Sequence, residues 1–219
     1  MPVDEFHRAV AATALRAAAR YGFALGGGNA LIAYGIIDRP TQDVDLFTDW
    51  EHGVRAAAGA VERALRAAGY VVEREDSTPD LADIFDGMGD GLAEWLITGP
   101  DGAQMMLQMA YFERDRRPVT MDLGPVLDLE DVMGWKVCAL ASRVEPRDYV
   151  DTAAALGRFT VGQLIRLAQH LDPGLTDRDF ADAGRQLDRM PDGLFARYGL
   201  SPADVALLRE RFTDWPRSA

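Results

Sequence analysis

Hydrophobic and polar residues follow two different periods along the first half of the chain. Apolar residues recur every three to four positions over residues 3–20 and 51–68, which predicts two amphipathic helices. Polarity instead alternates along residues 92–98 and 103–111, which flank the turn sequence Gly99-Pro100-Asp101-Gly102. This second pattern predicts a β-hairpin. The first half of the chain therefore predicts a sheet with helices packed beside it.

The remaining segments complete an α+β (α/β) plan. Residues 43–47 and 70–73 predict further short strands, and residues 83–91, rich in Gly and Asp, predict a loop. From about Leu129 onward the period is helical, with breaks at Pro146, Gly157, Pro173-Gly174, Pro191-Asp192-Gly193 and Ser201-Pro202. We therefore expect a mixed sheet flanked by helices over residues 1–125, followed by a helical C-terminal lobe over residues 126–219.

The composition is that of a globular protein. The chain has 219 residues, of which 48% are apolar and 26% charged, enough for a sizeable core. Its one cysteine, Cys138, can form no internal disulfide, which fits a reducing compartment. Residues 1–20 carry charges at short intervals, unlike a secretory signal, and the uncharged residues 21–37 contain five glycines and are too short for a bilayer span. We expect a cytoplasmic protein with no membrane segment.

A glycine-rich turn precedes a short apolar segment near residue 30. Gly26, Gly27 and Gly28 lack side chains, so their backbone N–H groups can approach a bound anion closely. Residues 30–36 predict a helix with Asn29 as its N-cap, whose positive end would point at the same anion. This arrangement favours a phosphate chain as the ligand.

Two aspartates follow the turn in the strand predicted at residues 43–47. Asp43 and Asp45 share one face, while Val44 and Leu46 point to the other. Adjacent carboxylates repel one another unless a cation lies between them, and Mg²⁺ is commonly bound by one or two carboxylates together with substrate phosphates. The pair therefore predicts a metal site, although a solvated strand edge protected by its charges has the same pattern.

At these residues the chain resembles the nucleotidyltransferase superfamily of DNA polymerase β, and more closely its AbiEii/MenT branch of bacterial toxin enzymes. That branch reads GG-small-A-L and then R-x-T-x-D-hydrophobic-D-L-F, and the matching residues here are Gly27-Gly28-Asn29-Ala30-Leu31 and Arg39-Pro40-Thr41-Gln42-Asp43-Val44-Asp45-Leu46-Phe47. The resemblance implies a polymerase β-like core that binds NTP through Gly26, Gly27, Gly28, Asn29, Arg39 and Thr41. It also implies Mg²⁺ or Mn²⁺ on Asp43 and Asp45.

Residues 128–156 resemble the later signature of the same branch, a helix bearing a Lys, then an Arg, then R-D-x-x-D opening another helix. Lys136 lies beside an apolar stripe of its helix, so we expect it to face inward. It is the only lysine among the 23 Lys and Arg residues, and its compact charge suits a phosphate. The resemblance implies that Lys136 binds the nucleotide and is catalytic, together with Asp151 or Asp148. For either acid an ordinary helix-surface role stays open.

Some residues depart from the pattern of the resemblance. Many superfamily enzymes draw a third carboxylate from a neighbouring strand, where this chain has Gln108. Glu94 on the preceding strand is a possible substitute, so the sequence leaves open whether one metal ion binds or two. Asn29 stands where the branch often has Ser or Thr, so a hydroxyl contact to phosphate would have to come from Thr41 or be replaced by a contact from an amide.

The resemblance implies a toxin that transfers NMP, with a pyrimidine favoured, to the 3′ acceptor end of tRNA and so blocks translation. It also implies a cognate antitoxin as partner. The formal net charge of −12 argues against a broad nucleic-acid surface. Residues 1–110 carry 8 basic against 17 acidic residues, and residues 111–219 carry 15 against 18. Any RNA contact is therefore expected in the second half, where the candidates are Arg114, Arg116, Arg117, Arg143, Arg147, Arg158 and Arg166.

Other functions stay open at this stage. An acidic chain suits a cationic acceptor, so an antibiotic nucleotidyltransferase acting on an aminoglycoside-like molecule is the main alternative. A non-catalytic nucleotide-binding or interaction protein with the same fold is another. Transfer of a nucleotide to a protein, or phosphorylation of an antitoxin, is a further possibility. The sequence identifies neither the base nor the oligomeric state.

Overall fold

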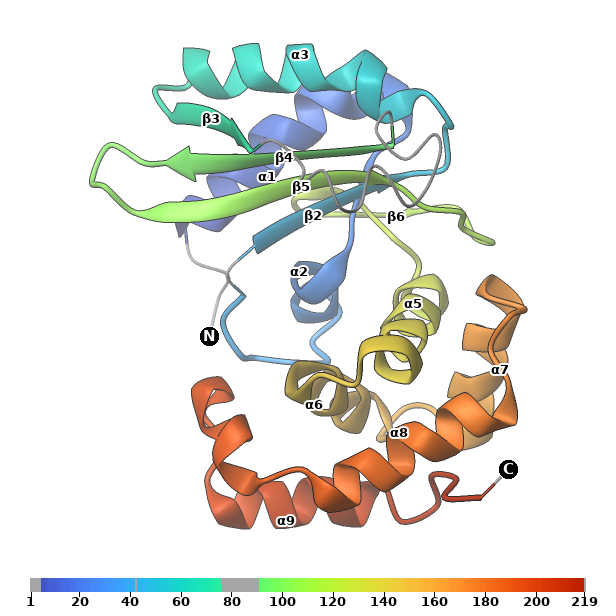
Figure 1. The fold of residues 1–219 in the computed structure, drawn as a ribbon. Coiled ribbons are helices and arrows are strands. Elements are labelled where there is room, and N and C mark those ends of the chain that lie inside the picture. The colour runs from blue at the N-terminus through green and yellow to red at the C-terminus, as the bar shows by residue number, and fades with distance from the viewer. Residues whose placement is uncertain (1–4, 42, 76–90, 219) are drawn as a thin grey trace. The chain divides into compact units, whose positions relative to one another are not determined.

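A computed structural model of the chain describes residues 5–41, 43–75 and 91–218 (Figure 1). The chain forms two compact units. The first, here called the sheet unit, comprises Met1–Ala33 and Pro40–Asp128. The second, the helical unit, comprises Leu129–Ala219 together with the short segment Tyr34–Arg39. The chain therefore enters the helical unit twice.

The sheet unit contains a mixed seven-stranded sheet with the strand order β3-β4-β5-β2-β1-β7-β6. β2 is parallel to β5 and β1 is parallel to β7, while the other neighbouring pairs are antiparallel. The predicted mixed sheet and the β4–β5 hairpin are confirmed. The strands are β1 (Ala24–Leu25), β2 (Asp43–Thr48), β3 (Val71–Glu75), β4 (Leu92–Thr98), β5 (Gln104–Tyr111), β6 (Val119–Met121) and β7 (Gly124–Val126).

Two helices cover one face of this sheet, α1 (Glu5–Ala18) and α3 (Gly53–Ala67), as Figure 1 shows. The alternating strand residues that face them, such as Val44, Leu46 and Trp95, are fully buried. Burial of this apolar face supplies most of the stabilisation of the unit. The alternate residues of the same strands, which include both aspartates of β2, are only half-buried. One face of the sheet is thus buried beneath α1 and α3, whereas side chains of the other face, Asp43 and Asp45 among them, stay partly accessible.

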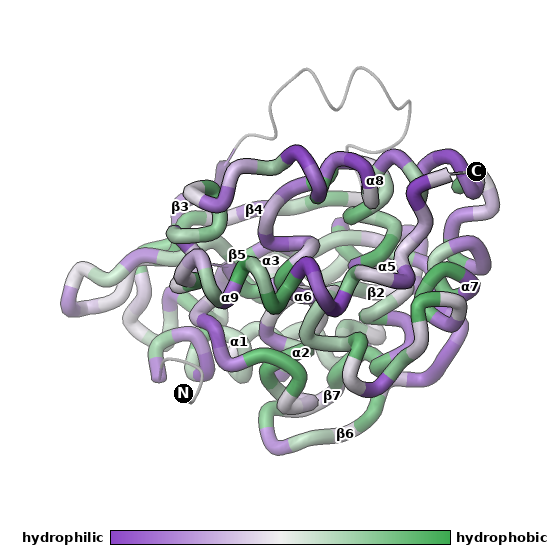
Figure 2. The backbone as a smooth tube through the Cα atoms, turned by 90° about the horizontal axis from the view of Figure 1, so that it is seen from below, coloured by the Kyte–Doolittle hydropathy of each residue, from purple (hydrophilic) through white to green (hydrophobic). Residues whose placement is uncertain are grey.

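The helical unit consists of helices separated at the predicted breaks. They are α5 (Leu129–Arg143), α6 (Pro146–Ala155), α7 (Val161–Leu171), α8 (Asp177–Arg189), the 3₁₀ helix Asp192–Tyr198 and α9 (Pro202–Arg211). Hydrophobic and hydrophilic residues alternate along these helices (Figure 2), as expected when one side of each is buried. Within the described parts of the chain, no helix has the length and apolar character required to cross a membrane.

The glycine-rich turn is the place where the predicted and observed elements differ. Helix α2 runs over Gly27–Ala33, so it begins at the second glycine and ends before Tyr34. The prediction of Asn29 as N-cap is wrong, because Asn29 lies inside the helix with its side chain buried. Residues 83–90 of the predicted loop, like residues 3 and 4 of the first helix, lie outside the described residues.

Candidate active site

Asp43 and Asp45 lie side by side on one face of β2. The burial of β2 alternates, with Val44, Leu46 and Thr48 buried and the two aspartates half-buried. Residues two apart in a strand are separated by about 6.6 Å at the Cα atoms, so both carboxylates are within reach of one bound cation. The predicted strand and the facing of the two acids are confirmed.

The glycine turn packs directly against this pair. The Gly26 N–H donates to the Asp45 carbonyl oxygen at 2.8 Å, which extends the β1–β2 ladder. Gly27 has a φ of +55°, and a Cβ atom there would lie 1.7 Å from Asp45 Oδ2. Only glycine fits at this position, because it tolerates both the left-handed backbone and the close carboxylate. Since the Gly26 N–H is engaged within the protein, the N–H groups of Gly27, Gly28 and Asn29 are the candidates for anion binding.

The side chain of Asn29 joins the turn to the aspartate strand. Its Nδ2 donates to the Asp43 carbonyl oxygen at 2.7 Å, and its Oδ1 accepts from Thr41 Oγ1 at 3.0 Å. This pair of contacts explains why a buried amide is tolerated inside a helix, since buried polar groups require partners. Asn29 and Thr41 therefore act in the structure as a brace that fixes the start of β2.

A row of polar side chains extends from Asp45 across the sheet. Gln108 of β5 pairs in register with Asp45, and Glu94 of β4 pairs with Gln108. The Gln108 Nε2 donates to Glu94 Oε1 at 2.8 Å. The position beside Asp45 is thus occupied by an amide, and the nearest acid in the row is one strand further away. Among the described residues, no group of three or more His, Cys, Asp or Glu residues is arranged to hold a metal ion.

These donors nevertheless fit one hard divalent cation. Two half-exposed carboxylates on adjacent same-face positions are a usual partial ligand set for Mg²⁺, which keeps waters and substrate phosphates as its other ligands. With Gln108 beside Asp45, the donor set suits one ion better than two. A site with two carboxylates, Asp43 and Asp45, and an amide at Gln108 thus fits the prediction of a metal site on β2, and it suits a single ion.

The second group of candidate residues lies in the helical unit. Lys136 of α5 forms an ion pair with Asp151 of α6, with Nζ to Oδ2 at 2.9 Å. Arg39 reaches the same carboxylate with Nε to Oδ1 and Nη2 to Oδ2, both at 2.8 Å. The side chains of Lys136 and Arg39 are 14% and 13% exposed and that of Asp151 is fully buried. Lys136 faces inward as predicted, and the helix-surface role left open for Asp151 is wrong.

Asp148, which lies on the same helix as Asp151, has a different partner. Arg143 donates to it from Nε at 2.9 Å and from Nη2 at 2.7 Å, and the Asp148 side chain is fully buried. A helix-surface role is therefore wrong for Asp148 too. Its carboxylate holds Arg143 at the end of α5, whereas Lys136 is held by Asp151. Of the two acids that the sequence left unseparated, Asp151 is the one beside the lysine.

The contact between Arg39 and Asp151 could not be found from the sequence. The two residues are 112 positions apart, and the resemblance assigned Arg39 to the nucleotide. In the structure its guanidinium donates to Asp151 and lies 5.8 Å from the centre of the Tyr198 ring. A pattern read along the chain contains no signal for such a long-range pair.

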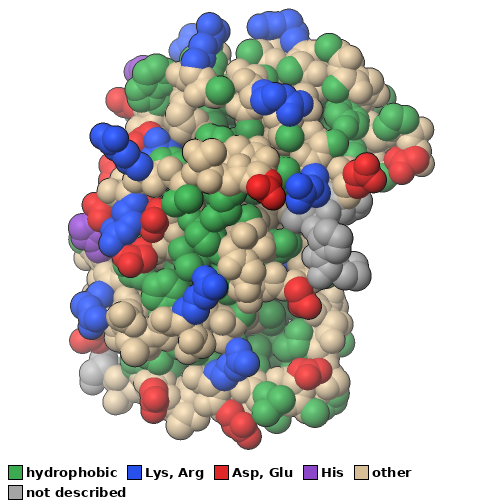
Figure 3. Space-filling view, turned by 180° about the vertical axis from the view of Figure 1, so that it is seen from behind, with side chains coloured by type: hydrophobic (Ala, Val, Ile, Leu, Met, Phe, Trp, Pro, Cys, Tyr) green, Lys and Arg blue, Asp and Glu red, His purple; other side chains and the backbone are tan. Residues whose placement is uncertain are grey.

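Several of the arginines proposed for RNA contact already hold acidic partners. Arg114 pairs with Asp49, Arg116 with Asp115 and Asp128, and Arg147 with Glu145, in addition to the Arg143–Asp148 pair. The exposed members of the predicted set are Arg117, Arg143, Arg158 and Arg166. Figure 3 shows one face of the molecule, on which basic and acidic side chains are interspersed. That face carries no continuous basic surface of the described residues.

Cys138 lies in the core of the helical unit. Its thiol is buried and lies 3.5 Å from the Ala168 carbonyl oxygen of α7. Burial raises the pKa of the Cys138 thiol to about 12. The thiol is therefore neutral at physiological pH, which makes it a poor nucleophile.

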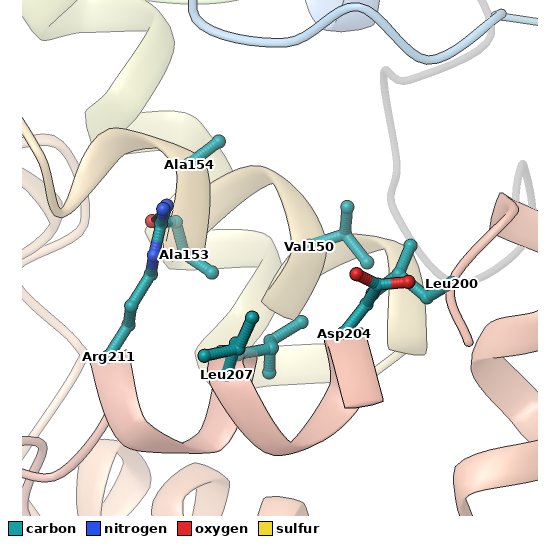
Figure 4. Close-up of a pocket in the computed structure, with 8 residues that line it drawn as sticks. Val150, Ala153, Ala154, Leu200, Asp204, Leu207 and Arg211 are labelled. Carbon is teal, nitrogen blue, oxygen red and sulfur yellow. Dashed lines mark hydrogen bonds between the residues drawn. The ribbon is translucent and has the colours of Figure 1, made fainter. Parts of the chain in front are cut away.

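A separate pocket of about 220 Å³ lies between α6 and α9 of the helical unit (Figure 4). Its lining is mainly apolar and includes Val150 and Leu207. The two charged groups at its edge are engaged within the protein, since Asp204 caps α9 through Ser201 and Arg211 donates to the Ala153 carbonyl oxygen. None of the predicted site residues lines this pocket.

Comparisons with known proteins identify the family and the fold of the chain. The family model described as nucleotidyl transferase AbiEii toxin, type IV toxin–antitoxin system, matches residues 8–214. No curated protein matches the chain. Among solved structures, MenT4, a nucleotidyltransferase toxin from Mycobacterium tuberculosis, has a TM-score of 0.59 and 13% identity, covering 95% of this chain and 82% of MenT4.

JHP933 from Helicobacter pylori has a similar fold, with a TM-score of 0.54 and 16% identity over 95% of this chain and 88% of JHP933. At these identities the solved structures establish the fold alone. The family model covers nearly the whole chain, including both blocks of predicted site residues. The chain belongs to the AbiEii family of nucleotidyltransferase toxins, and it is a nucleotidyltransferase.

Proposed function

We propose that this enzyme transfers NMP, preferably a pyrimidine nucleotide, from NTP to the 3′ acceptor end of tRNA and thereby blocks translation. The acceptor hydroxyl oxygen forms a bond to the α-phosphorus and loses its proton to solvent. The bond from the α-phosphorus to its bridging oxygen breaks, and pyrophosphate leaves with the electron pair of that bond. The observation that carries the proposal is the close approach of the Gly27 backbone to the Asp45 carboxylate. A phosphate-binding turn and a metal-binding acid in direct contact are the parts that nucleotidyl transfer requires.

In this proposal Asp43 and Asp45 hold a divalent ion, Mg²⁺ or Mn²⁺. When bound, such an ion offsets the negative charge of the triphosphate. The protein contributes the rigid strand that fixes both carboxylates and the brace of Asn29 and Thr41 behind them. The N–H groups of Gly27, Gly28 and Asn29 donate to phosphate oxygens. Most of the rate enhancement then comes from positioning and electrostatic stabilisation.

Lys136 donates to the phosphates that leave as pyrophosphate. Its ammonium carries three N–H bonds, and the ion pair with Asp151 engages one face of it. A charge fixed in advance stabilises the developing negative charge without reorganisation during the reaction. Lys136 therefore acts in the transition state more than in the binding of NTP.

The toxin description of the family supports an acceptor in the translation machinery and a cognate antitoxin as partner. The exposed arginines of the second half of the chain, such as Arg117 and Arg158, are the proposed contacts for the tRNA backbone. They would be few, which fits a contact confined to the acceptor end. We further propose that the enzyme acts in the cytoplasm, where tRNA is found.

One observation favours a second candidate function. Glu94 of β4 and Glu73 and Glu75 of β3 lie on the same face of the sheet as Asp43 and Asp45 of β2, as the strand register shows. Carboxylates on this face favour a cationic acceptor over a polyanion. The alternative is therefore transfer to a hydroxyl of an aminoglycoside-like antibiotic.

A labelling experiment distinguishes the two functions. The protein is incubated with each α-labelled NTP in Mg²⁺ and with either total tRNA or an aminoglycoside. Label on the 3′ end of tRNA from CTP or UTP is the expected result, and it should vanish with Asp45→Ala. Label on the aminoglycoside alone would replace the first function by the second. Label on neither acceptor, with NTP bound, would contradict both.

A further inference from the structure

Asp151 is bound by two cations at once, and this contact has the most defined geometry of any in the candidate site. Arg39 reaches both carboxylate oxygens through Nε and Nη2, each at 2.8 Å. Lys136 Nζ reaches Oδ2 at 2.9 Å. Three N–H donors from two cations therefore converge on one carboxylate. Such charge-assisted, two-pronged contacts fix orientation as well as distance.

The burial of this cluster makes its geometry costly to change. Asp151 is fully buried, and Arg39 and Lys136 are about seven-eighths buried. A buried carboxylate loses its hydration and is stable as an ion only if cations and hydrogen bonds replace the lost water. Arg39 supplies two of the three bonds, so the position of Asp151 depends on Arg39 more than on Lys136.

Both oxygens of Asp151 are engaged by cations. Oδ1 accepts from Arg39 Nε, and Oδ2 accepts from Arg39 Nη2 and forms the ion pair with Lys136 Nζ. The role of the carboxylate is therefore that of an anchor for the two cations.

We infer that Arg39 is a positioning residue, which holds Asp151 so that Asp151 orients the Lys136 ammonium toward the polyphosphate of the substrate. The inference rests on the proposed nucleotidyl transfer and reassigns Arg39, which the sequence resemblance places on the nucleotide. Arg39 touches no reacting atom in this role. Its effect reaches the reaction only through the orientation of Lys136.

The inference explains why an arginine is present. A guanidinium presents its donors in a planar fork that matches a carboxylate, whereas a lysine would contact Asp151 as a point charge and leave one oxygen without its partner. The guanidinium also lies 5.8 Å from the centre of the Tyr198 ring, a cation–π contact that restricts its orientation further. The fork, the ring and the buried acid together fix one arrangement of the cluster.

Steady-state kinetics of Arg39 variants test the inference. A positioning role predicts that Arg39→Ala lowers kcat by about 10- to 100-fold while KM for NTP stays near the wild-type value. Arg39→Lys keeps the positive charge but loses the planar pair of donors. Its kcat should therefore lie between those of the wild-type enzyme and Arg39→Ala. A nucleotide-binding Arg39 would instead raise KM with kcat largely unchanged, and that result would overturn the inference.

The matched control is Arg217→Ala. Arg217 also makes a two-pronged contact in the helical unit, to Asp188 at 3.1 and 2.9 Å, but it lies outside the proposed catalytic groups. Its removal should leave kcat and KM unchanged. If Arg39→Ala fails to fold, as judged by circular dichroism, Arg39→Lys carries the kinetic test alone, and a wild-type kcat in that variant counts against the inference.

Lys136 offers a readout that does not depend on activity, because it is the only lysine in the chain. Protein grown with ¹³C,¹⁵N-lysine gives a single set of side-chain NMR signals from Lys136. We expect the Cε and Nζ signals to move in Arg39→Ala and to stay in place in Arg217→Ala. Unchanged Lys136 signals in a folded Arg39→Ala protein would overturn the inference. If the wild-type enzyme labels no acceptor, the proposed function fails, while the NMR result still decides the role of Arg39.

Discussion

Carboxylates serve opposite purposes in the two units of the protein. In the sheet unit, Asp43 and Asp45 stand half-buried on an open face, with two like charges close together. In the helical unit, Asp151 is fully buried and shared by two cations. In the proposed function, the first arrangement receives a metal ion, whereas the second fixes the lysine that meets the phosphates. Exposure, rather than residue type, determines which of these an aspartate can do.

The comparison also predicts where stability and activity depend on the same residue. The half-buried carboxylates of Asp43 and Asp45 keep contact with water, which reduces their electrostatic contribution to folding. A buried acid with two cationic partners contributes strongly to stability and to activity, because its removal leaves two cations without a buried counter-charge. Substitutions of Asp43 or Asp45 should therefore separate activity from stability, and substitutions of Asp151 should not.

The largest expected effect is that of Asp45→Ala. Loss of one metal-binding carboxylate should reduce nucleotide transfer by about 10³-fold or more, because the electrostatic stabilisation of the phosphates is lost. The melting temperature should be unchanged or slightly higher. Initial rates with labelled NTP and a thermal melt measure both quantities, with the exposed Asp122→Asn as control. If the melting temperature fell together with activity, Asp45 would be needed for folding as well, and the contrast between the two units would be wrong.

Lys136→Met comes next. The substitution keeps an unbranched side chain of similar length and removes the ammonium that offsets charge on the leaving pyrophosphate. We expect kcat to fall by about 10²-fold, with little change in KM for NTP. A full kinetic series in NTP measures both constants. A raised KM with normal kcat would mean that Lys136 only binds the nucleotide.

Asp151→Asn sharpens the comparison from the helical side. The amide cannot balance Arg39 and Lys136, so the free energy of unfolding should fall by about 3 kcal/mol together with a loss of kcat. Urea denaturation followed by circular dichroism measures the stability. Unchanged stability with lost activity would show that Asp151 behaves like the open acids of the sheet.

Gly27→Ala should have a smaller effect on folding and a local effect on chemistry. The new methyl group would overlap Asp45 Oδ2, and the backbone would have to keep a φ of +55°. We expect a destabilisation of about 1–2 kcal/mol and at least a tenfold loss of transfer as Asp45 shifts. The substitution Gly35→Ala, at another positive φ but with open space around the Cβ position, separates the backbone strain from the contact with Asp45.

Alkylation of Cys138 gives the smallest and most local signal. Because burial raises the pKa of this thiol to about 12, it stays protonated at pH 8 and should react slowly with iodoacetamide in the native protein. Asp151→Asn should speed the reaction by loosening the packing around α5, whereas Gly27→Ala should not. Mass spectrometry at timed intervals follows the labelled fraction. Equal alkylation rates in the two variants would mean that a substitution in the sheet unit loosens the helical unit as much as one in the helical unit itself.

Local patterns were sufficient for most of the fold. The hairpin at Gly99-Pro100-Asp101-Gly102, the alternating strand with Asp43 and Asp45, and the helix breaks at proline and glycine all follow from side-chain period and backbone preference. Strands β1, β6 and β7 were not predicted, because two or three residues cannot show a period. Their pairing depends on neighbouring strands rather than on their own sequence.

The candidate site was less accessible from the sequence. Individual residues such as Lys136 could be proposed from the resemblance, but the partners of each acid could not. The pairs Arg39–Asp151 and Arg143–Asp148 depend on how helices pack, and nothing in the spacing of residues 148 and 151 distinguishes them. The helix start at Gly27 was also missed, because a glycine with positive φ reads as a turn until its contact with Asp45 is known.

The course of the chain through the helical unit limits how this protein can be divided. A fragment that starts at Leu129 would contain Lys136 and Asp151 but would lack Tyr34–Arg39, and with it the guanidinium that holds Asp151. In such a truncated piece the Asp151 carboxylate would lose two of the three contacts with cations that it has in the intact chain. The helical unit is therefore not an independent domain. A fragment that begins at Leu129 should be unable to fold by itself.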